Sequence, residues 1–507
     1  MTCQLWSFLL AIALVGCGTP RLTVLPAAYR QTQPAPGIEP PFLQPLPQAA
    51  RLSSNIDVFV VSRPRLPLVE LQLVIEGGRD TDPIGKEGRA DLCVNLLEQG
   101  TMSLGKQEFD REAARWGVSV GAFASPRHST LHASFSSAYK EKAFALFRAM
   151  VEHPRLREDA LARLVQDRQN TIAQEQATLH GRANRIALPA LYGRTHPEGR
   201  LASATSFGRV TLADCDAFYR DVLRSGYAFY VASGDIAPAD LEIHLGTFLS
   251  RREGSPARPM PRPSADAGPQ RQGGLRVYVS DAPNAVQSVV MILGLGPPIE
   301  APGRVARTLV VNLLGASFDS RLNLNLRESK GWTYGVGAWL DYVEGASGLF
   351  VRTQVEPDKT VPALSEMLKE LRDLGTHERP LSQEEFSRET RAISGKLPAT
   401  FETNEGILWF YRNRLVHGLA LRDDTEDELA GLTRDEVERQ VAPYANLDEM
   451  KVVVVGAADL VLPDLCRFMK AGRWGPVELS ILDAAGNLLP EPSRDPCASF
   501  VPEARGP

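Results

Sequence analysis

The chain has 507 residues, 43% of them hydrophobic and 23% charged, a composition that predicts more than one folded core and excludes disorder throughout. Its 56 Lys and Arg are balanced by 61 Asp and Glu, for a net charge of −5, so the basic excess typical of nucleic-acid binding is missing and no nucleic-acid partner is expected. Beyond residues 1–20, no apolar run is as long as a membrane-spanning helix.

The N-terminal segment is typical of an export signal. Residues 5–15 are apolar except for Ser7, and this run ends in Leu14-Val15-Gly16-Cys17. This pattern resembles the bacterial lipobox, which implies a signal peptide over residues 1–16 and a lipid attached to Cys17. A generic secretory signal is the alternative, because residues 1–6 carry no Lys or Arg. We therefore expect an exported lipoprotein, anchored in a membrane of the bacterial cell envelope and facing the periplasm or the outer membrane.

Pro-rich segments divide the rest of the chain. Residues 17–50 are rich in Pro and Gln and predict an extended tether. A second Pro-rich break at 251–274 predicts a linker between domains. We therefore expect one domain over 51–250, a second over 275–475, and a C-terminal tail over 476–507.

The two predicted domains repeat the same order of elements. Each begins with two apolar strand patterns and continues with a helix that contains the string Val-Asn-Leu-Leu, at 94–97 and at 311–314. A Gly-rich pair of strands, long helical patterns and a short apolar strand follow in both. Strands covered by helices, in two copies, predict the α+β class.

Several strings in this repeat resemble those of the insulinase/pitrilysin family of zinc metallopeptidases. They lie at 86–90, 98–101, 192–197 and 318–334. The resemblance covers 51–475 and implies two homologous domains, each an antiparallel-rich sheet covered by helices, arranged as a clamshell.

The zinc signature of that family is an inverted motif, H-x-x-E-H, on the first helix of the first domain. Its two His rings bind the metal ion from one helix face, and the Glu acts as general base on the bound water. Here the window reads Asp91-Leu92-Cys93-Val94-Asn95. Asn95 is a poor zinc ligand and Val94 cannot accept a proton. We therefore expect no metal or other cofactor in this chain, and no peptidase activity from it alone.

Other metal ligands are sparse. His128 and His132 fall in a strand pattern, where four residues span about 13 Å, too far for both rings to bind one metal ion. Glu175 lies near the family's third, acidic ligand, but without partners it is expected to be a solvated helix residue. His196 lies in a family string that is not a metal site, and a structural role is expected.

Four cysteines follow the predicted signal peptide and Cys17. They are Cys93, Cys215, Cys466 and Cys497. An exported protein can form disulfides, but four cysteines allow three pairings and a domain of this size does not require them. We predict no specific pairing.

The second domain keeps a pair of residues that the family uses. Active members have an Arg and a Tyr, seven residues apart, that face the zinc site across a closed chamber, and Arg327 and Tyr334 have that spacing. The resemblance implies that they bind substrate and stabilise the transition state. In the alternative, Arg327 pairs with an acid such as Glu328 or Asp319, and Tyr334 packs at the start of a strand.

A lost zinc motif with a retained Arg and Tyr resembles the non-catalytic subunit of the heterodimeric branch of the family. This implies a catalytically silent chain that completes the peptide chamber of a separate zinc-bearing subunit, with a peptide or an unfolded protein as substrate. A structural or binding scaffold is one alternative. An active zinc peptidase with atypical ligands is another.

Overall fold

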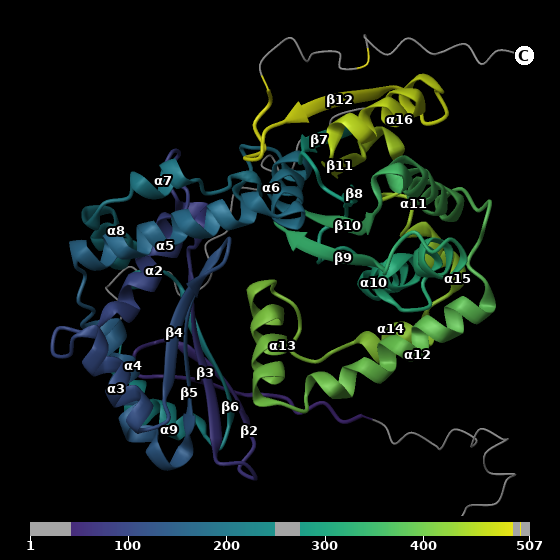
Figure 1. Ribbon diagram of the computed structural model, residues 1–507. Coiled ribbons are helices and arrows are strands. Elements are labelled where there is room, and N and C mark those ends of the chain that lie inside the picture. Colours follow the sequence, from purple (N-terminus) through teal and green to yellow (C-terminus); the bar gives the residue numbers. More distant parts are fainter. Residues whose placement is uncertain (1–41, 249–273, 490–496, 498–507) are drawn as a thin grey trace, which may run out of the picture. The chain divides into compact units, whose positions relative to one another are not determined.

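The computed structural model describes residues 42–248, 274–489 and 497 (Figure 1). The predicted signal peptide, Cys17 and most of the predicted tether and linker lie outside these residues. In the described ranges, no helix is both long and apolar enough to cross a bilayer.

The first domain is built on a six-stranded sheet in the order β1-β2-β6-β3-β5-β4. Neighbouring strands are antiparallel except for β2 and β6, which are parallel. The strands are β1 (Gln48–Arg51), β2 (Asp57–Ser62), β3 (Leu68–Glu76), β4 (Ser119–Ala124), β5 (His128–Ser136) and β6 (Ala228–Gly234). Alternate residues of β3 enter the core, as a strand covered by helices requires.

Helices cover this sheet. They are η1 (Arg79–Thr81), α2 (Arg89–Leu96), η2 (Leu97–Gln99), α3 (Lys106–Arg115), η3 (Ser137–Tyr139), α4 (Lys140–Glu152), α5 (Glu158–Ala177), α6 (Leu179–Tyr192), η4 (Pro197–Gly199), α7 (Ala204–Gly208), α8 (Leu212–Phe218), η5 (Tyr219–Leu223) and α9 (Pro238–Leu245). The buried side chains of α2 and α4 join those of the strands in one hydrophobic core.

The second domain has a six-stranded sheet in the order β12-β7-β11-β8-β10-β9. Here β7 is parallel to both β11 and β12, and the other neighbours are antiparallel. The strands are β7 (Leu275–Asp281), β8 (Ser288–Gly296), β9 (Val336–Val343), β10 (Ala346–Val355), β11 (Lys451–Gly456) and β12 (Val477–Leu482). With β1 and β12 set aside, the two sheets have the same strand order, so the predicted repeat and the α+β class are confirmed.

Helices also accompany the sheet of the second domain. They are α10 (Arg304–Val311), η6 (Asn312–Ala316), η7 (Asn323–Ser329), η8 (Pro357–Lys359), α11 (Thr360–Gly375), α12 (Gln383–Thr400), α13 (Asn404–Val416), α14 (Thr425–Gly431), α15 (Arg434–Arg439), η9 (Leu447–Glu449) and α16 (Ala458–Lys470). The string Val-Asn-Leu-Leu lies at the end of α2 in one domain and where α10 meets η6 in the other.

One helix of each domain packs on the sheet of the other domain (Figure 1). Helix α6 packs the apolar face of Ala183, Ile186 and Leu191 against β8, β10 and β11. Helix α13 lies on β3 and β6, where the Asn404 amide donates to the Leu68 carbonyl oxygen (3.3 Å). The packing of α6 and α13 therefore links the two sheets through buried side chains.

Two strands lie where the sequence predicts unstructured segments. Strand β1 lies across the end of the predicted tether, with all but Arg51 inside it, and its four exposed residues have no alternation that could reveal it. Strand β12 falls in the predicted tail, so the second domain extends beyond residue 475. The alternation of Val477, Leu479 and Ile481 is the signal for β12 that was missed.

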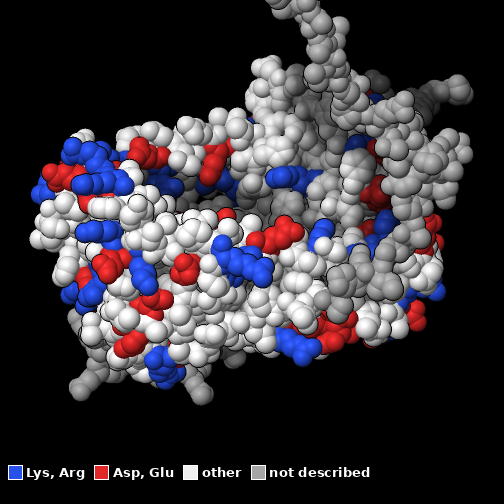
Figure 2. All heavy atoms as spheres, turned by 90° about the horizontal axis from the view of Figure 1, so that it is seen from below, with Lys and Arg blue, Asp and Glu red and all other residues white. Residues whose placement is uncertain are grey.

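Acidic and basic side chains lie in small mixed groups on the face shown in Figure 2. This mixture agrees with the balanced charge of the sequence.

Candidate functional site

A loop-to-helix junction sets the position of α2. Gly88 precedes the helix with a left-handed backbone (φ 96°), and a Cβ there would lie 2.2 Å from the Phe207 ring. The carboxylate of Asp82 accepts hydrogen bonds from the backbone N–H groups of Gly88 (2.7 Å) and Ala90 (2.8 Å). Burial raises the pKa of Asp82 to about 6, although these hydrogen bonds act to lower it. The role of Asp82 is therefore to cap the N-terminus of α2 by accepting hydrogen bonds from its first backbone N–H groups.

The window 91–95 turns most of its side chains into the core. Its three central residues are buried, and Cys93 forms a disulfide with Cys215 in α8. The side-chain amide of Asn95 donates to the backbone oxygen of Asp91 (2.6 Å). Of the five residues, Asp91 alone lines the adjacent pocket.

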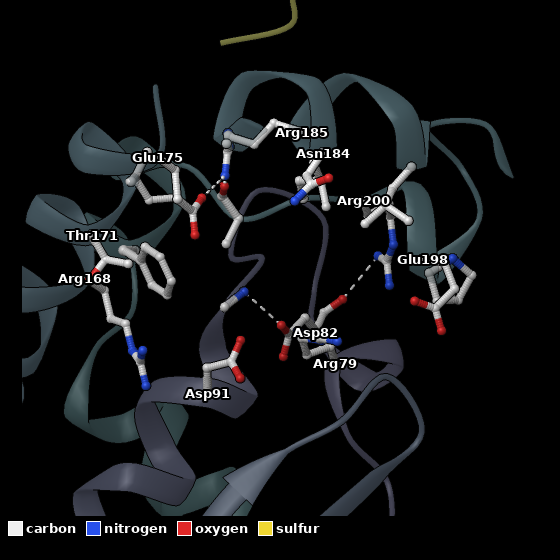
Figure 3. A pocket seen from close by; sticks show the side chains of 18 residues that line it. Arg79, Asp82, Asp91, Arg168, Thr171, Glu175, Asn184, Arg185, Glu198 and Arg200 are labelled. Carbon is white, nitrogen blue, oxygen red and sulfur yellow. Dashed lines mark hydrogen bonds and ion pairs between the residues drawn. The ribbon is translucent and has the colours of Figure 1, made fainter. Parts of the chain in front are cut away.

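That pocket has a volume of about 390 Å³ (Figure 3). Its walls come from η1, α2, α5, α6 and the segment around η4. Its larger apolar side chains are Ile172, Leu188, Leu201 and Phe207. Its charged side chains are four arginines and four acids: Arg79, Arg168, Arg185, Arg200, Asp82, Asp91, Glu175 and Glu198.

Some of these charged groups are engaged within the wall. The Oε2 atom of Glu175 lies 3.2 Å from Nη1 of Arg185. Arg200 donates to two backbone oxygen atoms, at 3.1 and 3.2 Å. The guanidinium groups of Arg79 and Arg168 make no hydrogen bond or ion pair with any residue that the structure describes.

The positive charges of Arg79 and Arg168 influence the pKa of Asp91. Burial raises the pKa of Asp91, and the positive charges of Arg79 and Arg168 oppose that shift. Figure 3 shows Arg168 of α5 beside Asp91 of α2. Burial, with the Asp341 carboxylate of the second domain adding to it, raises the pKa of Glu198 to about 7. The pocket thus offers the guanidinium groups of Arg79 and Arg168 and the half-buried carboxyl groups of Asp91 and Glu198.

The histidines considered in the sequence take structural positions. His128 and His132 both lie on β5, as predicted. Burial lowers the pKa of His128 to about 4 and lowers that of His132 as well, so both rings are neutral at neutral pH. The Nδ1 atom of His196 accepts a hydrogen bond from the Glu198 backbone (3.2 Å) and caps η4, which confirms a structural role.

Arg327 lies in η7 of the second domain. Its Nε atom is 3.4 Å from Oε1 of Glu328, and its guanidinium carbon lies 4.0 Å from the centre of the Phe318 ring. The pairing with Glu328 that the sequence offered as an alternative is therefore present. It leaves the guanidinium group part-exposed, held between an acid and an aromatic face.

Tyr334 lies in the segment between η7 and β9, and its side chain is 94% exposed. The alternative interpretation predicted that Tyr334 packs at the start of a strand, and the exposed side chain does not do so. Asn323, at the start of η7, is joined to Val336, at the start of β9, because its side chain accepts from the Val336 N–H (2.8 Å) and donates to the Val336 oxygen (3.1 Å). These bonds close the stretch 323–336, which contains Arg327 and Tyr334. In the described ranges, no hydrogen bond or ion pair joins Arg327 or Tyr334 to the pocket at Asp91.

The pocket arginines were missed in the sequence. They come from η1, α5, α6 and the segment after η4, which only the fold brings together. One local signal existed, since Arg168 and Glu175 lie seven residues apart in α5 and so share a helix face. Glu175 is 45% exposed, so the expected solvation is only partial, and its partner Arg185 was not anticipated.

Two family models match the chain. The model of the insulinase peptidases, peptidase family M16, matches residues 58–196, and that of the peptidase M16 inactive domain matches residues 209–393. Together they cover well over half of the chain. The chain belongs to the insulinase family.

Solved structures of several bacterial proteins share the fold of this insulinase-family chain. The peptidase M16 inactive domain from Pseudomonas fluorescens is 22% identical, with a TM-score of 0.71 over 81% of this chain and 98% of its own. A protease from Helicobacter pylori is 19% identical, with a TM-score of 0.68 over 81% of this chain and 100% of its own. The periplasmic protease PqqL from Escherichia coli is 14% identical, with a TM-score of 0.65 over 82% of this chain and 46% of its own. The comparison with curated protein sequences gave no match.

The family implies a zinc ion at the window in α2, but the residues present do not fit one. Val94 is buried in the core, and the side chain of Asn95 donates a hydrogen bond to the helix backbone. Glu175 faces Arg185, and Asp91 lies near two further arginines, whose positive charge repels a cation. In the part of the chain that the structure describes, no group of three or more His, Cys, Asp or Glu side chains could hold a metal ion.

Proposed function

We propose that this chain is the non-catalytic subunit of an insulinase-type peptidase, and that it presents Arg327 and Tyr334 to a peptide bound at the zinc site of a partner subunit. The observation that carries the proposal is a contrast within one chain. The three central residues of the window 91–95 are buried in the core and Cys93 is fastened by a disulfide, whereas Tyr334, seven residues after Arg327, is 94% exposed.

The chemistry of the two side chains suits this role. A guanidinium group binds a peptide carbonyl or carboxylate oxygen through a fork of N–H donors, and a phenol donates a hydrogen bond to a developing oxyanion. The contacts of Arg327 with Glu328 and Phe318 hold the guanidinium group before substrate arrives. The partner's zinc ion supplies the activated water, and this chain orients the peptide, so neither subunit cleaves efficiently alone.

The proposal places the protein at the bacterial cell envelope. A signal peptide over residues 1–16 and a lipid on Cys17 would export the chain and anchor it in the membrane. The two disulfides, Cys93–Cys215 and Cys466–Cys497, support export because disulfides persist in oxidising compartments.

Complex formation tests the proposal. The mature chain and a zinc-bearing homologue with the intact H-x-x-E-H motif, taken from the same organism, are mixed and analysed by size-exclusion chromatography with light scattering. A stable complex is the expected result, and Tyr334→Phe should leave it intact because the substitution removes only an exposed hydroxyl group. Separate elution of the two chains would refute the proposal. A complex that never cleaves peptides would instead favour the scaffold role.

A further inference from the structure

The pocket at Asp91 carries charges that no part of the proposed function uses. It occupies the side of α2 where the family binds a cation, yet two of its lining arginines, Arg79 and Arg168, make no hydrogen bond or ion pair with the described residues. Asp91 is equally free there, because no described hydrogen bond or ion pair reaches its carboxylate. Guanidinium donors and a carboxylate acceptor thus meet in one cavity without partners of their own.

We propose that this pocket binds a short peptide or a free amino acid, whose carboxylate group is held by Arg168 and Arg79 and whose amino group is held by Asp91. A guanidinium group is a usual protein partner of a carboxylate, which accepts two parallel N–H donors from the planar fork of one Arg. The half-buried carboxylate of Asp91 is stabilised by an opposite charge, which the ammonium group of a ligand provides.

The remaining lining supports a peptide ligand over a simple anion. A phosphate ion would gain from the arginines but would be repelled by Asp91 beside Arg168 (Figure 3). A ligand with both charges matches both groups. The apolar side chains of Ile172, Leu188 and Phe207 line the same cavity and can contact an apolar side chain of the ligand.

Of the other charged groups of the wall, all but Glu198 are engaged within the wall, and Glu198 is about half protonated at neutral pH because its pKa is about 7. Asp82 accepts hydrogen bonds from the start of α2, and Glu175 faces Arg185. Arg200 donates to backbone oxygen atoms. The cavity volume of about 390 Å³ lies within the usual range of small-ligand sites, roughly 300–1,000 Å³.

This inference does not depend on the proposed function, since it requires neither a partner subunit nor Arg327 and Tyr334. The test is isothermal titration calorimetry on the full mature chain with four probes: the dipeptide alanyl-leucine, its C-terminal amide, its N-acetyl form, and inorganic phosphate. We expect the dipeptide to bind, and to bind at least about tenfold more tightly than the amide or the N-acetyl form, because each of these removes one charged contact.

Single substitutions test which residue contacts which charged group of the dipeptide. Arg168→Gln and Arg79→Gln should each weaken dipeptide binding about tenfold. Asp91→Asn should weaken dipeptide binding and remove the preference over the N-acetyl form. The matched control is Arg163→Gln, because Arg163 lies on the same helix as Arg168 but is 62% exposed and outside the pocket.

Three results would overturn the inference. One is equal binding of the dipeptide and its amide, and another is binding of phosphate without binding of the dipeptide. The third is no heat of binding from any probe up to millimolar concentrations. Thermal unfolding of each variant, recorded alongside, separates a lost contact from a lost fold.

Discussion

Cys93, at the centre of the window that replaces the zinc motif, is joined by a disulfide to Cys215 in α8. The bond spans 122 residues and fastens α2 to a helix that follows much later in the chain. The helix that would present metal ligands is thus fixed from its buried side by a covalent link and by the core around it.

Removal of this disulfide should destabilise the first domain. Replacing Cys93 and Cys215 together by Ala is expected to lower the free energy of unfolding by about 2–5 kcal/mol, as for the loss of other native disulfides. Chemical denaturation of the oxidised protein and of the double variant measures the difference. Adding a reductant to the double variant should change its stability less than it changes that of the parent, and an unchanged denaturation midpoint in the double variant would contradict the prediction.

Glu198 should make stability depend on pH. Its pKa in the folded state is about 7, above the value of roughly 4.5 that an exposed Glu has. The protonated form therefore stabilises the fold fully below about pH 4.5, and this contribution is lost as the pH rises through 7. Relative to the parent, Glu198→Gln should gain stability between pH 4.5 and 8, by up to about 3 kcal/mol.

Unfolding free energies of parent and variant across this pH range provide the test. The control is Glu378→Gln, since Glu378 is 62% exposed and lies away from the pocket. A difference between parent and Glu198→Gln that stays constant with pH would show that Glu198 does not titrate in this range.

Helix α6 should contribute to stability through the sheet of the other domain. Ile186 of α6 is buried in the cluster that includes β8, β10 and β11. Ile186→Ala should lower the free energy of unfolding by about 2–5 kcal/mol, whereas Ile243→Ala should lower it by less than about 1 kcal/mol because Ile243 is 75% exposed. Equal losses in the two variants, measured by denaturation, would contradict the observed packing.

Asn323 should hold the segment that carries Arg327 and Tyr334. Its side chain is the hydrogen-bond partner of both the N–H and the oxygen of Val336, at the start of β9. Asn323→Ala leaves these buried groups unpaired, and a loss of about 1–3 kcal/mol in the free energy of unfolding is expected. Asn446→Ala is the exposed control, and a loss no larger than in this control would mean that Asn323 does not hold the segment.

The sequence predicted those parts of the fold that have a local signal. Alternating apolar residues revealed β3, and the repeated order of strands and helices revealed the two related domains and their α+β class. Strand β1 has four exposed residues without alternation, so its place beside β2 depends on tertiary contacts that no local pattern encodes.

At the candidate site, the sequence predicted only that the usual zinc ligands are missing. The window 91–95 shows by residue type alone that the usual ligands are missing. The pairing of Cys93 with Cys215 remained open because four cysteines allow several pairings. The pocket remained hidden because Arg79 and Arg168 lie far apart in the sequence and meet only where η1, α2 and α5 come together.

Peptidase activity in reconstituted mixtures tests the central claim most directly. The purified mature chain, the zinc-bearing homologue and their mixture are assayed on the same peptide, with zinc quantified in each sample and with Tyr334→Phe and the control Tyr139→Phe in the mixture. The account predicts efficient cleavage only in the mixture, a loss of at least about tenfold with Tyr334→Phe, and little change with Tyr139→Phe. Cleavage by this chain alone with stoichiometric zinc, or a mixture that is indifferent to Tyr334→Phe, would contradict it.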